Sequence, residues 1–263
     1  MFALPQIASS PATTPAFRAP RASADSAERL ASQLRREAVA DTLQLLVRTL
    51  EPQKRLVRAG DVIYRAGDAF DCLYILNSGL VKIVKLTSDG REQVVGLKFR
   101  GDWLGFDGIA RVGYGCDAVA MDTGEVWAIR YDALLAACGR HPTLLTALHE
   151  AMSHVISRDR DTLMSVCTLP ADARVANFLH DWAQCLGARG LRTDQITLRM
   201  TRAEIGNYLG LTLESVSRAL SKLAREEMIS FVEKGRREVR IPDLDALAEF
   251  VQRALCVERV VLQ

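Results

Sequence analysis

The chain has 263 residues, of which 49% are hydrophobic and 25% are charged, and its formal net charge is +2. This balance is typical of a globular protein, the length suggests two domains, and the small net charge excludes a strongly basic chain. The sequence has no apolar run near the ~20 residues that a membrane helix needs, and its N-terminus lacks signal-peptide features. We therefore expect a cytoplasmic protein with no membrane span.

Scattered cysteines argue against a disulfide framework, because the chain is long and lacks a secretion signal. The six cysteines are Cys72, Cys116, Cys138, Cys167, Cys185 and Cys256. Cys116 follows a glycine-rich loop and is a candidate redox-active thiol, although free cysteines are more often buried and unreactive. The four histidines show no metal-ligand spacing, so we predict no metal site.

Residues 1–25 are rich in Ala, Pro, Ser and Thr, a composition that predicts a disordered tail. Residues 26–140 are interpreted as a helical lead-in followed by a sensor domain. From Lys54 to about Tyr131, glycines separate short runs rich in Val, Ile, Leu and Tyr, a pattern that predicts a β-roll or sandwich. Ser-Asp-Gly at 88–90 lies between two of these runs and predicts a hairpin turn.

A long helix is predicted over residues 141–167, where apolar residues recur in steps of three and four. This a/d pattern is that of a helix that pairs with its own copy, but a helix packed on its own domain gives the same stripe, and both interpretations remain open. The predicted dimer interface comprises Leu145, Leu148, Met152, Val155, Ile156 and Asp159.

Asp159 continues the series that Leu145 and Met152 begin, so it would face its own copy in a symmetric dimer. Two facing carboxylates repel and lose solvation, which would weaken the dimer and make it easy to regulate. The alternative is that Asp159 lies in water or pairs with Arg158 or Arg160.

Residues 168–245 are predicted to form a winged helix-turn-helix domain. Pro170 breaks the long helix, and a further helix is expected from about Ala171 to Leu186. The stretch MTRAEIGNYLGLTLESVSRALSKL, residues 200–223, then reads as two short helices. Thr201 and the glutamate three residues later form a capping-box signature, and Gly210 suits the turn between the helices.

The second helix of such a pair enters the DNA major groove with its N-terminal residues at the base edges. Its outward residues Glu214, Ser217 and Arg218 suit base reading, since Arg pairs with guanine and Glu accepts from cytosine. Glu214 and Arg218 are four residues apart and can brace each other, or they are no more than a solvated pair.

The run MISFVEKGRREVRIP follows the helix pair and predicts a β-hairpin wing with a basic tip, which favours DNA binding. Between residues 198 and 240 there are nine Lys/Arg and six Glu, a local excess of +3 (9 − 6). The predicted DNA-backbone contacts are Thr201, Arg202, Thr212, Lys222, Lys234, Arg236 and Arg237. Residues 246–263 are predicted to add a C-terminal helical extension.

This order of β-roll, long helix and winged helix resembles the Crp–Fnr superfamily of bacterial transcription regulators over about residues 40–245. The helix pair and the stretch GDWLGFDGIA resemble the fumarate-and-nitrate-reduction-regulator branch. The resemblance implies a homodimer on double-stranded DNA, with half-sites like TTGAT in an inverted repeat with a four-base gap. It also implies that a loop contacts RNA polymerase, comprising Thr87, Ser88, Asp89, Gly90 and Arg91.

Two departures concern cofactors. Relatives that bind cyclic nucleotides use a Glu and an Arg-Ser pair, whereas this chain has Phe106-Asp107 and the stretch 113–118, GYGCDA, so we expect no cAMP binding. Oxygen-sensing relatives hold a [4Fe–4S] cluster with N-terminal cysteines, and such a cluster needs about four thiolates. No cysteine precedes Cys72, and Trp127 fills the position of the β-roll cysteine, so we expect no such cluster.

We therefore predict an α+β fold with an N-terminal cyclic-nucleotide-binding-like β-roll, a long dimerisation helix and a C-terminal winged helix-turn-helix. The expected function is a sequence-specific dimeric transcription regulator, an activator, responding to oxygen or redox state. The alternative is a ligand-binding β-roll protein whose helix pair mediates only protein contacts. No constellation of catalytic residues supports an enzyme.

Overall fold

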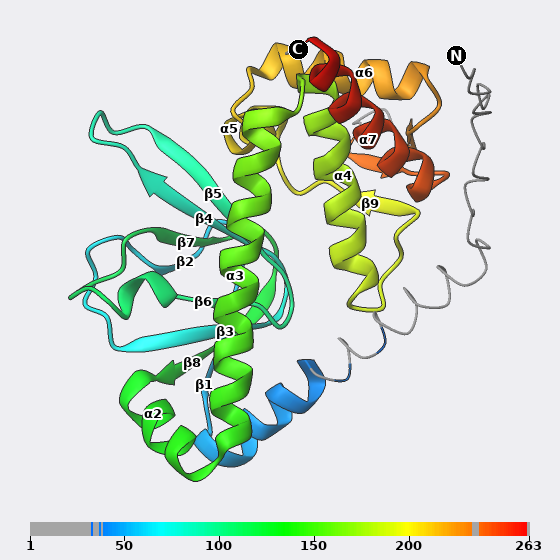
Figure 1. Cartoon of the computed structure of the whole chain (residues 1–263). Coiled ribbons are helices and arrows are strands. Elements are labelled where there is room, and N and C mark those ends of the chain that lie inside the picture. The colour runs from blue at the N-terminus through cyan, green and yellow to red at the C-terminus, as the bar shows by residue number, and fades with distance from the viewer. Residues whose placement is uncertain (1–32, 34–36, 38, 233–236, 262–263) are drawn as a thin grey trace, which may run out of the picture.

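The computed structural model describes residues 33, 37, 39–232 and 237–261, with side chains described as far as residue 256. The predicted tail and the wing-tip residues Lys234 and Arg236 lie outside the described residues. The described chain forms a β-roll, a long helix beside it and a helical domain at one end (Figure 1). The predicted α+β architecture is confirmed.

Eight strands build the β-roll, in two antiparallel sheets with the orders β1-β8-β3-β6 and β2-β7-β4-β5. The strands are β1 (Gln53–Val57), β2 (Val62–Tyr64), β3 (Cys72–Ser78), β4 (Val81–Leu86), β5 (Glu92–Lys98), β6 (Trp103–Leu104), β7 (Asp117–Ala120) and β8 (Gly124–Arg130). The predicted turn at 88–90 joins β4 to β5, and Gly90 adopts a φ of 80° there. The short strands β1, β6 and β7 were not among the predicted runs.

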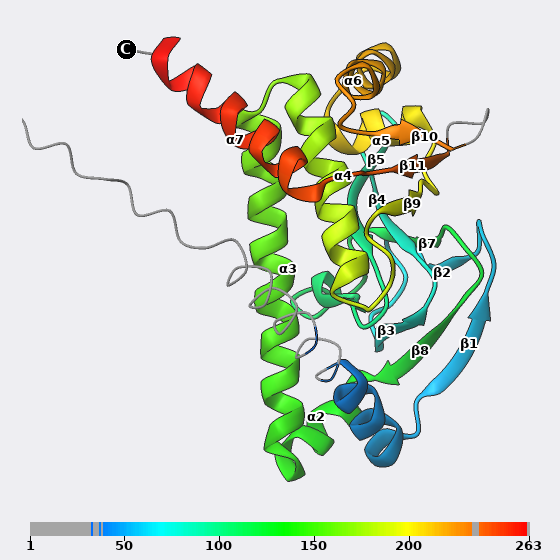
Figure 2. The same cartoon turned by 90° about the vertical axis from the view of Figure 1, so that its right-hand side faces the viewer.

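The helix α3 (Pro142–Thr168) runs the length of the molecule beside the β-roll (Figures 1 and 2). Residues 39–50 and α2 (Tyr131–Arg140) are also helical, and α2 was missed because its sequence was assigned to the β-roll segment. Leu144 and Leu148 of α3 are buried against the β-roll. One part of the apolar stripe therefore packs on its own chain.

The C-terminal domain contains four helices and a three-stranded sheet of order β10-β11-β9. Its elements are α4 (Ala171–Gly187), β9 (Gln195–Thr197), α5 (Arg202–Leu209), α6 (Leu213–Arg225), β10 (Ser230–Phe231), β11 (Glu238–Arg240) and α7 (Leu244–Val261). The wing was predicted as a two-stranded hairpin, and β9 adds a third strand to it. Helix α7 begins slightly before the predicted extension and packs against α4.

The β-roll and the C-terminal domain share one hydrophobic core. Val94 and Phe99 of the β-roll lie in the same buried cluster as the inward faces of α4, α5 and α6. The ring of Phe99 meets the ring of Trp182 edge to face, with their centroids 5.6 Å apart. The domain that carries the helix pair is therefore fixed against the sensor domain by apolar burial.

Asp102 adds an ionic link at the same boundary. Its carboxylate pairs with Arg158 of α3 at 2.9 Å and with Arg189, beyond α4, at 2.8 Å. Burial alone would raise the pKa of Asp102, but the two guanidinium groups outweigh burial and hold the pKa below its usual range. Because the folded pKa is depressed, these pairs stabilise the fold at neutral pH and are lost as the pH falls through that pKa.

Among the helices of the described residues, none is both long enough and apolar enough to cross a membrane.

Gly206 tests the close contact on which the helix pair depends. A Cβ on Gly206 would lie 2.6 Å from the backbone oxygen of Leu211, so we expect Gly206→Ala to lower the free energy of unfolding by about 1–3 kcal/mol. Gly139→Ala is the control, since its Cβ would meet no heavy atom within 4 Å, and alanine favours a helix by up to ~1 kcal/mol. Urea denaturation measures both, and equal midpoints for the two variants would contradict this packing.

Candidate nucleic-acid interface

The first helix of the pair, α5, begins at the predicted capping box. The backbone N–H of Glu204 donates to the Thr201 hydroxyl at 3.1 Å, and the backbone N–H of Thr201 donates to the Glu204 carboxylate at 2.8 Å. Gly210 ends the helix with a φ of 65°, the left-handed conformation that glycine adopts at low cost. Because these signals are local in sequence, the turn between α5 and α6 could be predicted.

The second helix, α6, begins at Thr212, whose hydroxyl accepts a hydrogen bond from the backbone N–H of Ser215 at 3.1 Å. Its predicted inward residues Val216, Leu220 and Leu223 are all buried. Burial of this face turns the opposite face of α6 toward solvent.

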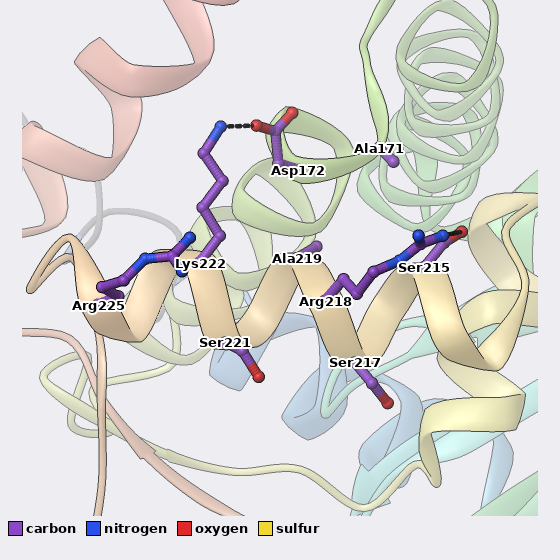
Figure 3. Close-up of a pocket in the computed structure, with 9 residues that line it drawn as sticks. All are labelled: Ala171, Asp172, Ser215, Ser217, Arg218, Ala219, Ser221, Lys222 and Arg225. Carbon is purple, nitrogen blue, oxygen red and sulfur yellow. Dashed lines mark hydrogen bonds and ion pairs between the residues drawn. The ribbon is translucent and has the colours of Figure 1, made fainter.

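The three predicted base-reading residues lie on that outer face. Glu214 and Arg218 are exposed, and Ser217 is half-buried. Ser221 and Arg225 continue the same face at helical spacing, and both line a groove beside the helix (Figure 3). Sequence reasoning missed these two residues, although they follow Glu214 by seven and eleven positions and so share its face.

Arg218 has a different neighbour from the one expected. Its guanidinium donates to the Ser215 hydroxyl at 3.4 Å (Figure 3), whereas the sequence suggested a brace from Glu214. A single hydrogen bond as long as this one is weak. The side chain of Arg218 can therefore exchange this contact for a base edge at little cost.

A groove of about 630 Å³ lies between α6 and the first residues of α4. It is lined by Ala171, Asp172, Ser215, Ser217, Arg218, Ala219, Ser221, Lys222 and Arg225 (Figure 3). Serine hydroxyls and three cationic side chains are groups that contact DNA phosphates. Asp172 is the exception, because its carboxylate would repel a phosphate.

Lys222, a predicted backbone contact, is paired with Asp172 in the free protein (Figure 3). The ammonium of Lys222 also lies 5.7 Å from the centre of the Phe250 ring. Burial alone would raise the pKa of Asp172, but the hydrogen bond from Lys222 and a backbone N–H hold the pKa below its usual range. The positive charge of Lys222 is therefore already balanced by Asp172 in the free protein. Lys222 must give up this ion pair to contact DNA.

The remaining predicted backbone contacts lie at the helix caps and on the wing. Thr201 and Thr212 are exposed, and Arg237 is exposed beside β11. The guanidinium of Arg202 lies 6.0 Å from the centre of the Phe231 ring, so it braces the wing against α5. Of the three cations of the predicted basic tip, Arg237 is the one among the described residues. Its side chain is exposed and can reach a phosphate.

The exposed face of α3 differs from the predicted one. Leu148, predicted at the dimer interface, is only 5% exposed and packs within its own chain. The predicted interface residues Leu145 and Ile156 are exposed, and two further large apolar side chains, Leu163 and Met164, are exposed as well. Met152 and Val155 are half-buried, and Asp159 is exposed between Ile156 and Leu163 on the same face. Leu163 and Met164 were missed because the apolar stripe was not followed beyond Asp159.

The β-roll region around Asp107, where the sequence predicted no cAMP binding, carries two carboxylates. The carboxylate of Asp107 accepts a hydrogen bond from the backbone N–H of Gly115 at 2.8 Å, which places a negative charge on the loop. The Asp117 carboxylate likewise accepts from the backbone N–H of Ala66. The structure also brings the guanidinium of Arg111 beside Gly115, a cation that sequence reasoning did not place there.

The cysteines do not fit a thiolate-bound cluster. They lie in β3, next to β7, and in α2, α3, α4 and α7, and none is in a disulfide. Burial raises the pKa of Cys72 to about 11 and also raises the pKa values of Cys116, Cys138 and Cys185. In the described part of the chain, no three His, Cys, Asp or Glu residues gather where a metal ion could be held.

A sensor-type β-roll joined by a long helix to an exposed recognition helix defines a DNA-binding transcription regulator. Two family models match, a cyclic nucleotide-binding domain over residues 54–141 and a Crp-like helix-turn-helix domain over residues 173–250. The fumarate and nitrate reduction regulatory protein of Escherichia coli K12 is 33% identical over 197 residues, 75% of this chain and 78% of that protein.

The anaerobic regulatory protein of Haemophilus influenzae is 32% identical over 75% of this chain and 76% of its own length. Among solved structures, FixK2 from Bradyrhizobium japonicum matches with a TM-score of 0.67 and 27% identity, over 75% of this chain and 96% of that one. The chain belongs to the Crp–Fnr family of transcription regulators. Membership also favours DNA binding over the alternative in which the helix pair makes only protein contacts.

Asp172 is expected to limit non-specific binding. Asp172→Asn frees Lys222 for a phosphate, so it should tighten binding to every duplex and steepen the dependence of log K on log salt by about one. Fluorescence anisotropy at several salt concentrations measures both effects. Asp132→Asn is the control, because it removes the same charge from an exposed pair with Arg130, and α2, which carries Asp132, lies far from α6 (Figure 1). Equal effects of the two variants would exclude this role for Asp172.

Proposed function

We propose that the chain is a homodimeric, sequence-specific regulator that activates transcription from an inverted repeat like TTGAT-N4-ATCAA. The observation that carries the proposal is the exposed face of α6. Glu214, Ser217 and Arg218 lie together on this face, near the N-terminal end of the helix. A recognition helix reads bases with this end. These three residues match E-x-x-S-R, the base-reading positions of the fumarate-and-nitrate-reduction-regulator branch that the helix pair resembles, and this match supports the half-site sequence.

Base reading follows from the chemistry of the three side chains. Arg218 can donate two hydrogen bonds to the O6 and N7 atoms of one guanine, and Glu214 can accept from the exocyclic amine of a cytosine. Ser217, half-buried between them, can donate or accept. Thr201, Arg202, Thr212, Lys222 and the basic wing would supply phosphate contacts that position α6 without reading sequence.

Dimerisation through α3 is supported by its exposed apolar face. Ile156 is 48% exposed and Leu163 is 62% exposed, and they are seven residues apart with Asp159 between them. A second copy of α3 would bury this face, in the manner of a two-stranded coiled coil. Asp159 would then face its own copy, and the repulsion between the two carboxylates would keep the dimer weak.

The loop between β4 and β5 supports a contact with RNA polymerase. Asp89 and Arg91 form an ion pair at 3.1 Å, and both side chains are largely exposed. The Thr87 hydroxyl donates to the backbone oxygen of Arg91 at 3.0 Å, which orders the loop. We infer that these residues, with Ser88 and Gly90, present a preformed surface to the polymerase.

The signal is proposed to concern oxygen or redox state, because the relatives are named for anaerobic and for fumarate and nitrate regulation. The dispersed cysteines argue against the [4Fe–4S] cluster that the resemblance implies, and the raised pKa of Cys116 argues against a reactive thiol there. Asp107 on the Gly115 amide argues against cAMP at the usual site. As a regulator of bacterial promoters, the protein would act in the cytoplasm.

Arg218→Ala should weaken sequence discrimination with little loss on random DNA. A bidentate arginine–guanine contact discriminates by about 1–3 kcal/mol, so the ratio of specific to scrambled affinity should fall roughly 5- to 150-fold. Gel-shift titration of both duplexes measures the ratio. Arg237→Ala is the matched control and should weaken both duplexes alike. Equal losses on both duplexes for Arg218→Ala would remove Arg218 from base reading.

Two substitutions on α3 should move dimerisation in opposite directions. Ile156→Asp puts a charge on the proposed interface and should yield monomers, whereas Asp159→Leu removes the repulsion and should tighten the dimer. Sedimentation equilibrium gives the dissociation constants. Val112→Asp is the control, because Val112 is 95% exposed on a β-roll loop away from α3. Unchanged constants for both α3 variants would place the interface elsewhere.

A further inference from the structure

The hairpin of β4 and β5 reaches the helix pair and binds α5 through one side chain, Asn207. The Asn207 amide donates to the backbone oxygen of Glu92 at 2.7 Å. Its carbonyl oxygen accepts from the backbone N–H of Val94 at 2.6 Å. Both ends of the Asn207 side chain therefore bind the free edge of β5, whose only neighbour among the described strands is β4. Figures 1 and 2 show α5 lying against this hairpin.

Two further contacts reinforce the attachment. The Gln93 side chain donates to the backbone oxygen of Asn207, and the ammonium of Lys82 pairs with the Glu204 carboxylate at 2.6 Å. Glu204 also closes the capping box at the start of α5. The hairpin therefore contacts α5 at the side chain of Asn207, at the backbone oxygen of Asn207 and at the glutamate of the N-terminal capping box.

Holding α5 also holds α6, because the two helices cannot move independently. A Cβ on Gly206 would clash with the backbone oxygen of Leu211, so the turn lies directly against α5. Arg174 donates to the backbone oxygens of both Leu209 and Leu169, at 2.9 Å each, which ties the end of α5 to the end of α3. The orientation of α5 on the hairpin therefore sets the direction in which the outer face of α6 points.

We propose that Asn207 is a positioning residue that sets the half-site spacing this regulator accepts. This inference rests on the proposed function as a dimer on an inverted repeat. In such a dimer the two recognition helices must lie about 34 Å apart, one turn of DNA. Chain connectivity alone leaves the C-terminal domain free to turn about the break at Leu169 and Pro170. The shared core holds the domain on the β-roll, and the two hydrogen bonds of Asn207 select one orientation within that contact.

The test separates the reading of a half-site from the spacing between half-sites. Wild-type protein and Asn207→Ala are titrated on duplexes with spacers of three, four, five and six bases, on a single half-site and on a scrambled duplex. We expect Asn207→Ala to retain its half-site preference over scrambled DNA. Its preference for the four-base spacer over the six-base spacer should fall roughly 5- to 150-fold, the range of a typical coupling between sites.

Asn177→Ala is the matched control. Asn177 is also a half-buried helical asparagine of the C-terminal domain, but its amide donates to Asp181 on its own helix at 3.0 Å. It should keep the wild-type spacer preference. Asn207→Asp is a second variant, which retains the acceptor for the Val94 amide, loses the donor to the Glu92 oxygen and should relax spacing as well.

Hydrogen exchange of the DNA-free proteins gives a readout that does not depend on the proposed function. Exchange should quicken in β5 and in α5 together in Asn207→Ala, while β8 and α7 stay as in the wild type. Unchanged spacer preference, or loss of half-site recognition together with spacing, would overturn the positioning role. If wild-type protein itself ignored DNA sequence, the proposed function would fail, and unchanged exchange in β5 and α5 would then overturn the attachment by Asn207.

Discussion

The contact between α5 and the β-roll determines where the outer face of α6 points. A regulator that binds two half-sites gains affinity from the second site only if both recognition helices already point correctly. Two kinds of link meet this constraint here. The shared core around Phe99 buries apolar surface, and the polar contacts of Asn207 and Asp102 select one direction within that burial. Burial stabilises the contact between the two domains. The hydrogen bonds and ion pairs determine the orientation of that contact, because they require defined distances and angles.

The parts of the fold that sequence could predict are those fixed by local rules. The capping box at Thr201, the turn at Gly210 and the start of α6 at Thr212 depend on neighbouring residues, and the structure has all three. The partners of Arg218 and Lys222 depend on where α4 and Ser215 lie after folding, so spacing alone could not identify them. The same reason explains α2 and β9, which are short and take their stability from tertiary contacts.

The exposed face of α3 illustrates the same limit. Periodicity identified an apolar stripe, but a stripe does not say whether it meets the β-roll or a second copy. Leu148 proved to pack on its own chain, while Ile156 and Leu163 are exposed. The sensor domain shows the converse case: the resemblance implies a cyclic nucleotide or a cluster, yet the Asp107 carboxylate and the dispersed cysteines of this chain do not suit those groups.

Sequence-specific recognition without a cluster can be tested by titrating purified protein on a TTGAT-N4-ATCAA duplex and on a scrambled duplex, in air with and without reductant, while recording the visible spectrum. We expect specific binding in air by a colourless protein. Absence of specific binding in air, with a brown chromophore after anaerobic preparation, would contradict it and would show that the cysteines hold iron. Equal binding of both duplexes under every condition would contradict sequence-specific recognition itself.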